Sequence, residues 1–319
     1  MKVGLITAAG SLTDDPYNWM SYQGLLRAEA DLGVDGTVYT AVVSEDYASN
    51  LEQCVTDGNV LCISVGFTTS DAISNAAVAH PGTKFAIVDV SYPSYPSNLR
   101  GITFNVNQAA YLAGILAGSM SESQIVGAIG GMEIPPVTAY TLPFRNGVQC
   151  ASPGATVLLA YTGDFDNPPH GAQVAEEFMS QGADVIFSPA GATGIGAVLA
   201  TTQAGKWGIG VDTDAYYSVF GGGTVEGSDK LLTSALKKLD SGVYHTVQDV
   251  VGGTFTPGDV LYGLADEGTG LAPYHETEPE IPAAVRARLE RVRQGILAGR
   301  IDVNGTECRN YLYLPLITR

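Results

Sequence analysis

Two carboxylates and one lysine follow strand-like segments in the second half of the chain. Asp212 and Asp214 come directly after the apolar run Ile209–Val211, and Lys237 follows in the segment 233–238. Because side chains just past the carboxyl end of a strand line the ligand crevice of an open α/β sheet, we expect this group to line such a crevice. Carboxylate acceptors and an ammonium donor suit a small polar ligand held by hydrogen bonds.

A second polar group follows the first strand-like segment. Asp14, Tyr17 and Asn18 precede a predicted helix, whose N-terminus supplies backbone N–H groups to the same crevice. Asp14 and Asn18 could instead cap this helix, with Tyr17 simply packed beside them. The residues by themselves leave both interpretations open.

A strand-length apolar run, a Gly- or Ser-rich turn and a helical stretch recur along the chain. This alternation predicts parallel sheets covered by helices on both faces, joined by right-handed crossovers. The predicted strands are 3–7, 37–42, 61–65, 85–90, 101–104, 125–129, 157–161, 185–188 and 207–211. The predicted helices include 19–32, 71–79, 109–120, 171–181, 196–204 and 282–298. So many strands favour two sheets, each from about half the chain, with a cleft between them.

Composition narrows the class of protein. The chain has 319 residues, of which 45% are hydrophobic and 15% charged, as is typical of a globular protein. Its apolar runs, such as Phe85–Val88, fall far short of the roughly 20 residues that a membrane helix requires. The net charge of −17 opposes binding to phosphate backbones, so we expect no nucleic acid polymer as a partner.

The cysteines and the first residues bear on the cellular compartment. Four cysteines form an even set with no C-x-x-C pair, which argues against a zinc site. They could form two disulfides, Cys54–Cys62 and Cys150–Cys308, or remain four buried thiols. The first predicted strand follows Met1 at once with no apolar signal ahead of it, so either the protein is cytosolic or a signal has been removed.

Short motifs follow one another in a defined order. The series opens with Asp14-x-x-Tyr17-Asn18 and Gly24, and it closes with Thr233-Ser234-x-x-Lys237. Between them lie the segments 64–67, 84–89, 102–104, 111–118, 127–135, 161–168, 181–187, 190–194 and 208–214. Over roughly residues 3–300 this series resembles the basic membrane protein family, the purine nucleoside receptor A-like substrate-binding lipoproteins of ABC importers.

The resemblance implies a type I periplasmic-binding-protein fold, with two Rossmann-like lobes whose parallel sheets are joined by three crossovers. The N-terminal lobe would hold residues 1–105 plus 236–256, and the C-terminal lobe 106–235 plus 257–319. It further implies a monomer outside the cytoplasm, periplasmic or lipid-anchored, that binds a nucleoside, most simply a purine nucleoside, and delivers it to an ABC permease in the membrane.

The resemblance also assigns roles within the site. A base would stack between aromatic rings, an amide and a carboxylate would bind its polar edge, and a carboxylate with a lysine would hold the ribose. Matched by position, the rings are Tyr17 and Phe165, the base-reading pair is Asn18 and Asp89, the ribose pair is Asp212 and Lys237, and further lining residues are Asp14, Phe67 and Gly191. Stacking on an aromatic face contributes about 1–3 kcal/mol per base, so these roles are physically reasonable.

The chain departs from the family pattern at three places, one of which is Trp19-Met20, where the family commonly has smaller polar residues. Tyr17 stands where the family usually has Phe, and its hydroxyl could add a polar contact or narrow the pocket. The segment Pro135–Pro143, interpreted as a loop, also differs from the usual pattern. Lys237 is retained, which favours a nucleoside over a bare base.

Two other classes of protein stay open. A nucleoside-processing enzyme could use Asp212 and Asp214, but no histidine lies in a catalytic motif and neither a Gly-x-Ser-x-Gly sequence nor a P-loop is present. We therefore expect no catalysis, no cofactor and no metal. A cytosolic ligand-sensing domain of the same fold would agree with a missing signal, whereas a Cys54–Cys62 disulfide would point away from the cytosol.

Overall fold

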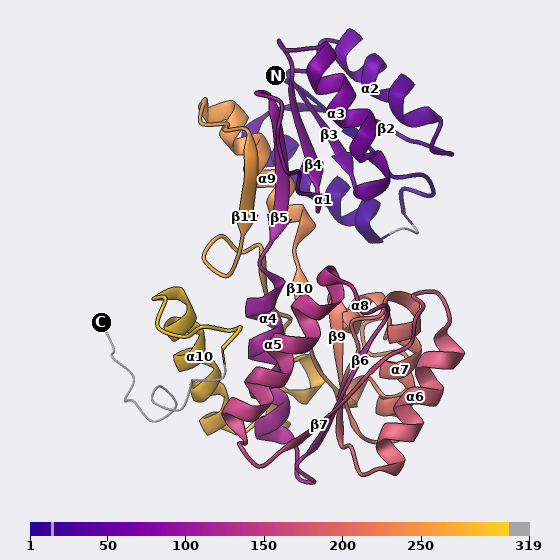
Figure 1. Ribbon diagram of the computed structural model, residues 1–319, viewed down its shortest axis with the longest axis vertical. Coiled ribbons are helices and arrows are strands. Elements are labelled where there is room, and N and C mark those ends of the chain that lie inside the picture. The colour runs from indigo at the N-terminus through magenta and orange to yellow at the C-terminus, as the bar shows by residue number, and fades with distance from the viewer. Residues whose placement is uncertain (14–15, 306–319) are drawn as a thin grey trace. The chain divides into compact units, whose positions relative to one another are not determined.

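The computed structural model describes residues 1–13 and 16–305, which fold into two compact units (Figure 1). Unit 1 comprises Met1–Phe104 and Lys238–Gly268, and unit 2 comprises Asn105–Lys237 and the segment from Thr269 onward. The chain passes between the units three times, after Phe104, Lys237 and Gly268. Unit 1 extends past residue 256, where the expected N-terminal lobe ends, because its last strand pairs with β5.

Unit 1 is built on a six-stranded parallel sheet with the order β11-β5-β4-β3-β1-β2. Every residue of β3 is buried, as expected for a strand covered by helices on both faces. The strands are β1 Lys2–Ile6, β2 Asp35–Tyr39, β3 Leu61–Val65, β4 Lys84–Val88, β5 Leu99–Phe104 and β11 Gly258–Tyr262. The helices are α1 Pro16–Leu32, α2 Asp46–Thr56, the 3₁₀ turn η1 Phe67–Thr69, α3 Ser70–Ala79 and α9 Leu239–Gly252.

Unit 2 repeats this design with the strand order β12-β10-β9-β8-β6-β7. Its pairs are parallel except for the edge strand β12, which runs antiparallel to β10. The strands are β6 Ile125–Gly130, β7 Thr156–Tyr161, β8 Val185–Phe187, β9 Trp207–Asp212, β10 Leu231–Lys237 and β12 Thr269–Leu271. The helices are α4 Val106–Met120, α5 Pro135–Ala151, α6 Pro168–Ser180, α7 Gly191–Gln203, α8 Ala215–Ser218, η2 Ser228–Lys230, η3 His275–Glu280 and α10 Ala283–Leu297.

The structure confirms the α/β class and the two largely parallel sheets. The predicted strands overlap β1 to β9, and the predicted helices overlap α1, α3, α4, α6, α7 and α10. The interpretation of Pro135–Pro143 as a loop is wrong, because these residues begin α5. Pro135 and Pro136 occupy its first turn, where backbone N–H groups have no partner within the helix, so proline is tolerated there.

Both units contain closely packed helix pairs in which glycine allows the backbones to approach, among them α4–α5 in unit 2 and α1–α9 in unit 1. In unit 2, a Cβ on Gly114 of α4 would overlap the carbonyl oxygen of Phe144 on α5, and one on Gly147 of α5 would overlap that of Tyr111 on α4. In unit 1, Gly24 of α1 lies against the carbonyl oxygen of Asp240 on α9. The pair α4–α5 is therefore locked through glycines on both helices, and the pair α1–α9 through Gly24.

A disulfide joins Cys54 of α2 to Cys62 of β3, and both half-cystines are fully buried. One of the two possible disulfides is thus present, within the core of unit 1. The second predicted pair involves Cys308, which lies outside the described residues.

Candidate functional site

In unit 1, Asp89 directly follows β4 and takes a left-handed backbone conformation with φ 64°. Such a conformation is unusual for a residue other than glycine and often marks a functional turn. The backbone N–H of Asp89 donates to the Ile102 carbonyl at 2.7 Å, which anchors the turn to β5. The hydroxyl of Tyr17, the second residue of α1, lies 3.5 Å from Asp89 Oδ2. The structure therefore places the Tyr17 hydroxyl beside the Asp89 carboxylate. The family resemblance assigned both residues to one site but did not show that they are in contact.

Asn18 is fully buried and organises the loop that follows β1. Its Oδ1 accepts from the Ala8 N–H at 2.9 Å, and its Nδ2 donates to the carbonyls of Ala8 at 3.2 Å and Ser11 at 3.3 Å. The alternative in which Asn18 caps the helix is excluded, because α1 begins at Pro16 and the Asn18 side chain bonds back to the preceding loop. Asp14 lies outside the described residues.

Phe67 begins η1 after β3, and its side chain is 77% exposed. The turn that carries it is fixed through Tyr47 of α2. The Tyr47 hydroxyl accepts from the Ala9 N–H at 2.9 Å and bonds to Thr68 Oγ1 at 3.1 Å. Tyr47 thus ties the loops after β1 and β3 together, and it leaves an aromatic ring exposed at the carboxyl end of the sheet.

In unit 2, Asp212 ends β9 with φ 62°, nearly the conformation of Asp89. The hydroxyl of Tyr140 on α5 donates to Asp212 Oδ1 at 2.6 Å. Tyr140 is only 5% exposed, and it was not among the predicted site residues. It was missed because its segment was interpreted as a loop, although the spacing of the apolar residues Val137, Tyr140 and Phe144 is a helical signal.

The two aspartates singled out together, Asp212 and Asp214, have different partners. Asp214 Oδ1 accepts from the Tyr216 N–H at 3.2 Å as the N-cap of α8. Its Oδ2 lies 2.8 Å from His275 Nε2, and the His275 ring stacks on Tyr216 with centroids 4.0 Å apart. Asp214 therefore holds the turn after β9, next to the turn residue Asp212.

Phe165 and Gly191 lie beside each other because Thr193 of α7 joins their segments. Thr193 N–H donates to the Phe165 carbonyl at 3.2 Å, and its Oγ1 donates to Asp164 Oδ1 at 2.6 Å. Gly191 has φ 57°, and a Cβ there would come within 2.9 Å of the Phe165 carbonyl oxygen, so only glycine fits without strain. The Phe165 ring lies against Gly131, where any Cβ would collide with it.

Asp164 is the acceptor at the centre of this loop. His170 Nδ1 lies 2.8 Å from Asp164 Oδ2. The hydrogen bonds from Thr193 and then from His170 hold the pKa of the Asp164 carboxyl below its usual value. The segment that carries Phe165 is thereby fixed by ionised Asp164.

Lys237 is the last residue of β10 and is 6% exposed. Leu236 is in register with Asp212, so Lys237 lies one residue beyond the aspartate on the neighbouring strand. The sequence identified Lys237 but not its strand. The strand ends of unit 2 thus contribute Gly191, Asp212 and Lys237 along neighbouring β8, β9 and β10.

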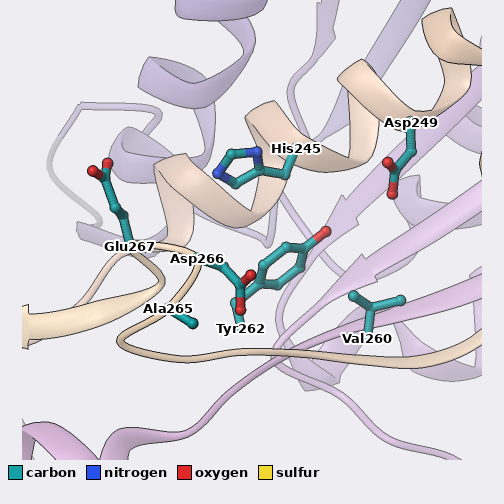
Figure 2. Close-up of a pocket in the computed structure, with 7 residues that line it drawn as sticks. All are labelled: His245, Asp249, Val260, Tyr262, Ala265, Asp266 and Glu267. Atoms are coloured by element: carbon teal, nitrogen blue, oxygen red, sulfur yellow. The ribbon is translucent and has the colours of Figure 1, made fainter. Parts of the chain in front are cut away.

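Unit 1 also has an open pocket of about 570 Å³ between α9, β11 and the following connection. Figure 2 shows the His245 ring above the Tyr262 ring, with Asp249 on one side and Asp266 and Glu267 on the other. The lining residues are His245, Asp249, Val260, Tyr262, Ala265, Asp266 and Glu267.

None of the predicted site residues lines this pocket. Its innermost groups serve the fold of unit 1, because Asp249 Oδ2 accepts from buried Arg100 at 2.6 Å and burial raises the pKa of Tyr262. The pocket is therefore distinct from the group of residues at the strand ends.

Across residues 1–13 and 16–305, no three His, Cys, Asp or Glu side chains are grouped so that they could hold a metal ion. No helix in the same ranges is both long and apolar enough to cross a bilayer.

Comparison with known proteins gives a consistent picture. A family model described as ABC transporter substrate-binding protein PnrA-like matches residues 1–307. The chain is 31% identical to the CD4+ T-cell-stimulating antigen of Listeria monocytogenes, over 94% of this chain and 87% of that protein. It is 28% identical to the ABC transporter nucleoside-binding protein BmpA of Lactococcus lactis, over 95% of this chain and 89% of that protein.

Among solved structures, the chain is similar to an ABC transporter solute-binding protein from Aeropyrum pernix K1. The TM-score is 0.76 at 25% identity, and the match covers 95% of this chain and 92% of the other.

Proposed function

Because the chain belongs to the family of PnrA-like ABC transporter substrate-binding proteins, we propose that it binds a nucleoside, in particular a purine nucleoside, for uptake. The observation that carries the proposal is the pair of strand-end aspartates, Asp89 and Asp212. Asp89 follows β4 and Asp212 ends β9, two strands that hold the same position in their sheets, and each aspartate lies beside a tyrosine hydroxyl. The similarity to a relative named as nucleoside-binding supports the same ligand class.

The proposed contacts follow from the chemistry of a nucleoside. Tyr17 and Phe165 stack on the base, and Asp89 binds its polar edge. The amide of Asn18 already bonds to Ala8 and Ser11, so Asn18 contacts the base only through a second hydrogen bond accepted by Oδ1. Asp212 accepts a hydrogen bond from the ribose, and the Lys237 ammonium donates to it. Asp14, Phe67 and Gly191 line the site around these groups.

The rest of the proposal concerns the setting of the protein. It acts outside the cytoplasm as a monomer, in the periplasm or anchored by lipid, and passes its ligand unchanged to an ABC permease. The Cys54–Cys62 disulfide supports that location, because such bonds persist in oxidising compartments and are rare in the cytosol. The same bond disfavours the cytosolic sensor.

Calorimetric titration tests the proposal most directly. The protein is unfolded and refolded to remove any carried ligand, then titrated with adenosine, guanosine, inosine, cytidine, uridine, free adenine and ribose. We expect purine nucleosides to bind tightly, and adenine and ribose alone to bind much more weakly. No binding of any nucleoside would contradict the proposed ligand class, and release of ribose during incubation would show an enzyme instead.

A further inference from the structure

The carboxylate of Asp212 is held at one oxygen. Its Oδ1 accepts from the Tyr140 hydroxyl at 2.6 Å, the length expected when a hydroxyl donates to an ionised carboxylate. Within the described residues, Asp212 Oδ2 has no hydrogen-bond partner. One oxygen is therefore committed to the protein, and the other can accept from a ligand.

Tyr140 is itself held firmly. Its ring is 5% exposed and lies 6.2 Å from the ring of Phe187 on β8, which packs at 4.8 Å against Phe144 on α5. The next residue, Thr141, is fully buried and bonds through Oγ1 to the Tyr161 hydroxyl of β7 at 3.0 Å. The hydroxyl of Tyr140 cannot turn away from Asp212 unless this aromatic cluster repacks.

The backbone fixes the other end of the aspartate. Val211 and Asp212 pair in register with Ala235 and Leu236 of β10, and Asp212 then takes φ 62°. With its backbone set by the strand end and Oδ1 set by Tyr140, the plane of the carboxylate is determined. An accepting oxygen in a fixed plane requires a hydrogen-bond donor from the ligand, such as a hydroxyl.

Unit 1 shows the same pairing independently. Asp89 follows the equivalent strand at nearly the same φ, and the hydroxyl of Tyr17 lies 3.5 Å from its Oδ2. In both units the tyrosine comes from the helix after the equivalent strand, α1 after β1 and α5 after β6. The recurrence makes a chance contact a poor explanation for the Tyr140–Asp212 bond.

We propose that Tyr140 is a positioning residue, which orients Asp212 so that Oδ2 accepts a hydrogen bond from a ribose hydroxyl. The inference rests on the proposed nucleoside binding, and it adds the residue that sets selectivity for ribose over deoxyribose. Tyr140 acts through Asp212 and does not itself contact the ligand.

The test compares Tyr140→Phe with wild type by calorimetric titration of adenosine and 2′,3′-dideoxyadenosine. We expect the variant to bind adenosine about tenfold more weakly, as for loss of one hydrogen bond near 1.4 kcal/mol. Affinity for the dideoxy compound should change less than twofold, because it lacks the hydroxyls that Asp212 accepts. In an Asp212→Asn background, Tyr140→Phe should have no further effect on adenosine binding.

Tyr161→Phe is the matched control, since it removes another hydroxyl bonded to α5 but leaves Asp212 untouched. It should leave the ratio of adenosine to dideoxyadenosine affinity unchanged. Equal losses for both ligands in Tyr140→Phe, or no loss for either, would overturn the positioning role.

A measurement without ligand separates this inference from the proposed function. Urea unfolding is measured for wild type, Tyr140→Phe, Asp212→Asn and the double variant. The changes in unfolding free energy should be non-additive, as for residues in direct contact. If wild type bound no nucleoside while the changes were non-additive, the proposed ligand would be wrong and the fixed orientation of Asp212 would stand. Additive changes would overturn the inference whatever the ligand is.

Discussion

Unit 1 and unit 2 place an aspartate at the end of the equivalent strand, but they hold it differently. In unit 2 the Tyr140 hydroxyl lies 2.6 Å from Asp212, and the ring is almost fully buried. In unit 1 the Tyr17 hydroxyl lies 3.5 Å from Asp89, and the ring is only half-buried near the start of α1. The comparison indicates that unit 2 offers a carboxylate of fixed orientation, whereas unit 1 offers one whose tyrosine can also present its ring to a ligand.

The helix pairs α4–α5 and α1–α9 also differ, in how tightly their backbones are packed together. In unit 2, α4 and α5 approach through Gly114 and Gly147, each facing the backbone of the other helix. In unit 1 only Gly24 faces the backbone of α9, while Gly242 of α9 faces the side chains of Ile102 and Phe104. Backbone cannot yield to an added atom as easily as side chains can, so α9 has more room to adjust than α4.

The largest effect should come from Gly147→Ala. Its Cβ would overlap the Tyr111 carbonyl oxygen in a contact with no flexible atom to move, and overpacking of this kind costs about 3 kcal/mol of unfolding free energy. Gly24→Ala in unit 1 should cost about 1–2 kcal/mol, because α9 can shift.

Each unit contains one tryptophan, Trp19 in unit 1 and Trp207 in unit 2, so fluorescence in urea can follow the two units separately. Trp207→Phe and Trp19→Phe backgrounds isolate the two signals. Gly154→Ala is the control, because the nearest neighbour of its Cβ would be Gln124 Oε1 at 3.6 Å. An equal loss of unfolding free energy in Gly24→Ala and Gly147→Ala would contradict the inference that α1–α9 can adjust more easily than α4–α5.

The next effect concerns ligand affinity. Asp212→Asn should weaken adenosine binding by about 1.5–3 kcal/mol, the contribution of a hydrogen bond to a charged group. Asp89→Asn should weaken it less, because an asparagine can still bond to the polar edge of a base. Calorimetric titration measures both, with Asp31→Asn as a control at an exposed carboxylate paired with Arg27. If Asp89→Asn lost more adenosine affinity than Asp212→Asn, the proposal that Asp212 is the fixed ribose acceptor and Asp89 the adjustable base contact would be contradicted.

Asp212 could be predicted from the sequence as a residue at the end of a strand, since the residue after a parallel strand has a defined place at the sheet edge. Asp89 lay inside the strand predicted at 85–90, and only the family resemblance assigned it and Tyr17 to the site, while Tyr140 was not predicted at all. Tyr140 was missed because three prolines obscured the helix, although two lie in its first turn and Pro143 is tolerated within it. Which helix side chain meets a strand end depends on tertiary packing, which a local pattern does not contain.

Strand β10 shows a different reason for a missed element. Leu231–Lys237 includes Thr233 and Ser234, whose polarity interrupts the apolar run that indicates a buried strand. Both side chains are bonded internally, Thr233 to the Ala272 carbonyl at 2.8 Å and Ser234 to the Ala215 N–H at 3.1 Å. Polar residues that find partners only in the folded chain cannot be told from loop residues in one sequence.

A smaller effect on the stability of unit 2 is expected when the pH is lowered. Hydrogen bonds from Thr193 and His170 hold the pKa of Asp164 below its usual value near 3.8, so its ionised form stabilises unit 2 at neutral pH. This contribution is complete above about pH 5 and is lost as the pH falls through the usual value and then the lowered one. Asp164→Asn should therefore lower the urea midpoint of the Trp207 signal at pH 6, and the difference from wild type should shrink towards pH 3.

Asp229→Asn is the control for that titration, since Asp229 is exposed and lies 3.6 Å from Lys230. The urea midpoint of Asp229→Asn should stay close to that of wild type from pH 6 to pH 3. A difference for Asp164→Asn that grew as the pH fell would contradict the stabilising role of the ionised carboxylate.

The smallest effect separates two buried serines of unit 1. Among the described residues, the hydroxyl of Ser21 on α1 has no hydrogen-bond partner, whereas Ser64 at the end of β3 accepts from Thr69 Oγ1 at 2.8 Å. Because a buried polar group without a partner costs about 1–3 kcal/mol, Ser21→Ala should raise the unfolding free energy of unit 1 by about 1 kcal/mol. Ser64→Ala should lower it, since Thr69 then loses an acceptor. If Trp19 fluorescence in urea showed a loss of unfolding free energy for Ser21→Ala as well, the Ser21 hydroxyl must be bonded in solution, for instance to a water molecule, and the contrast with Ser64 would disappear.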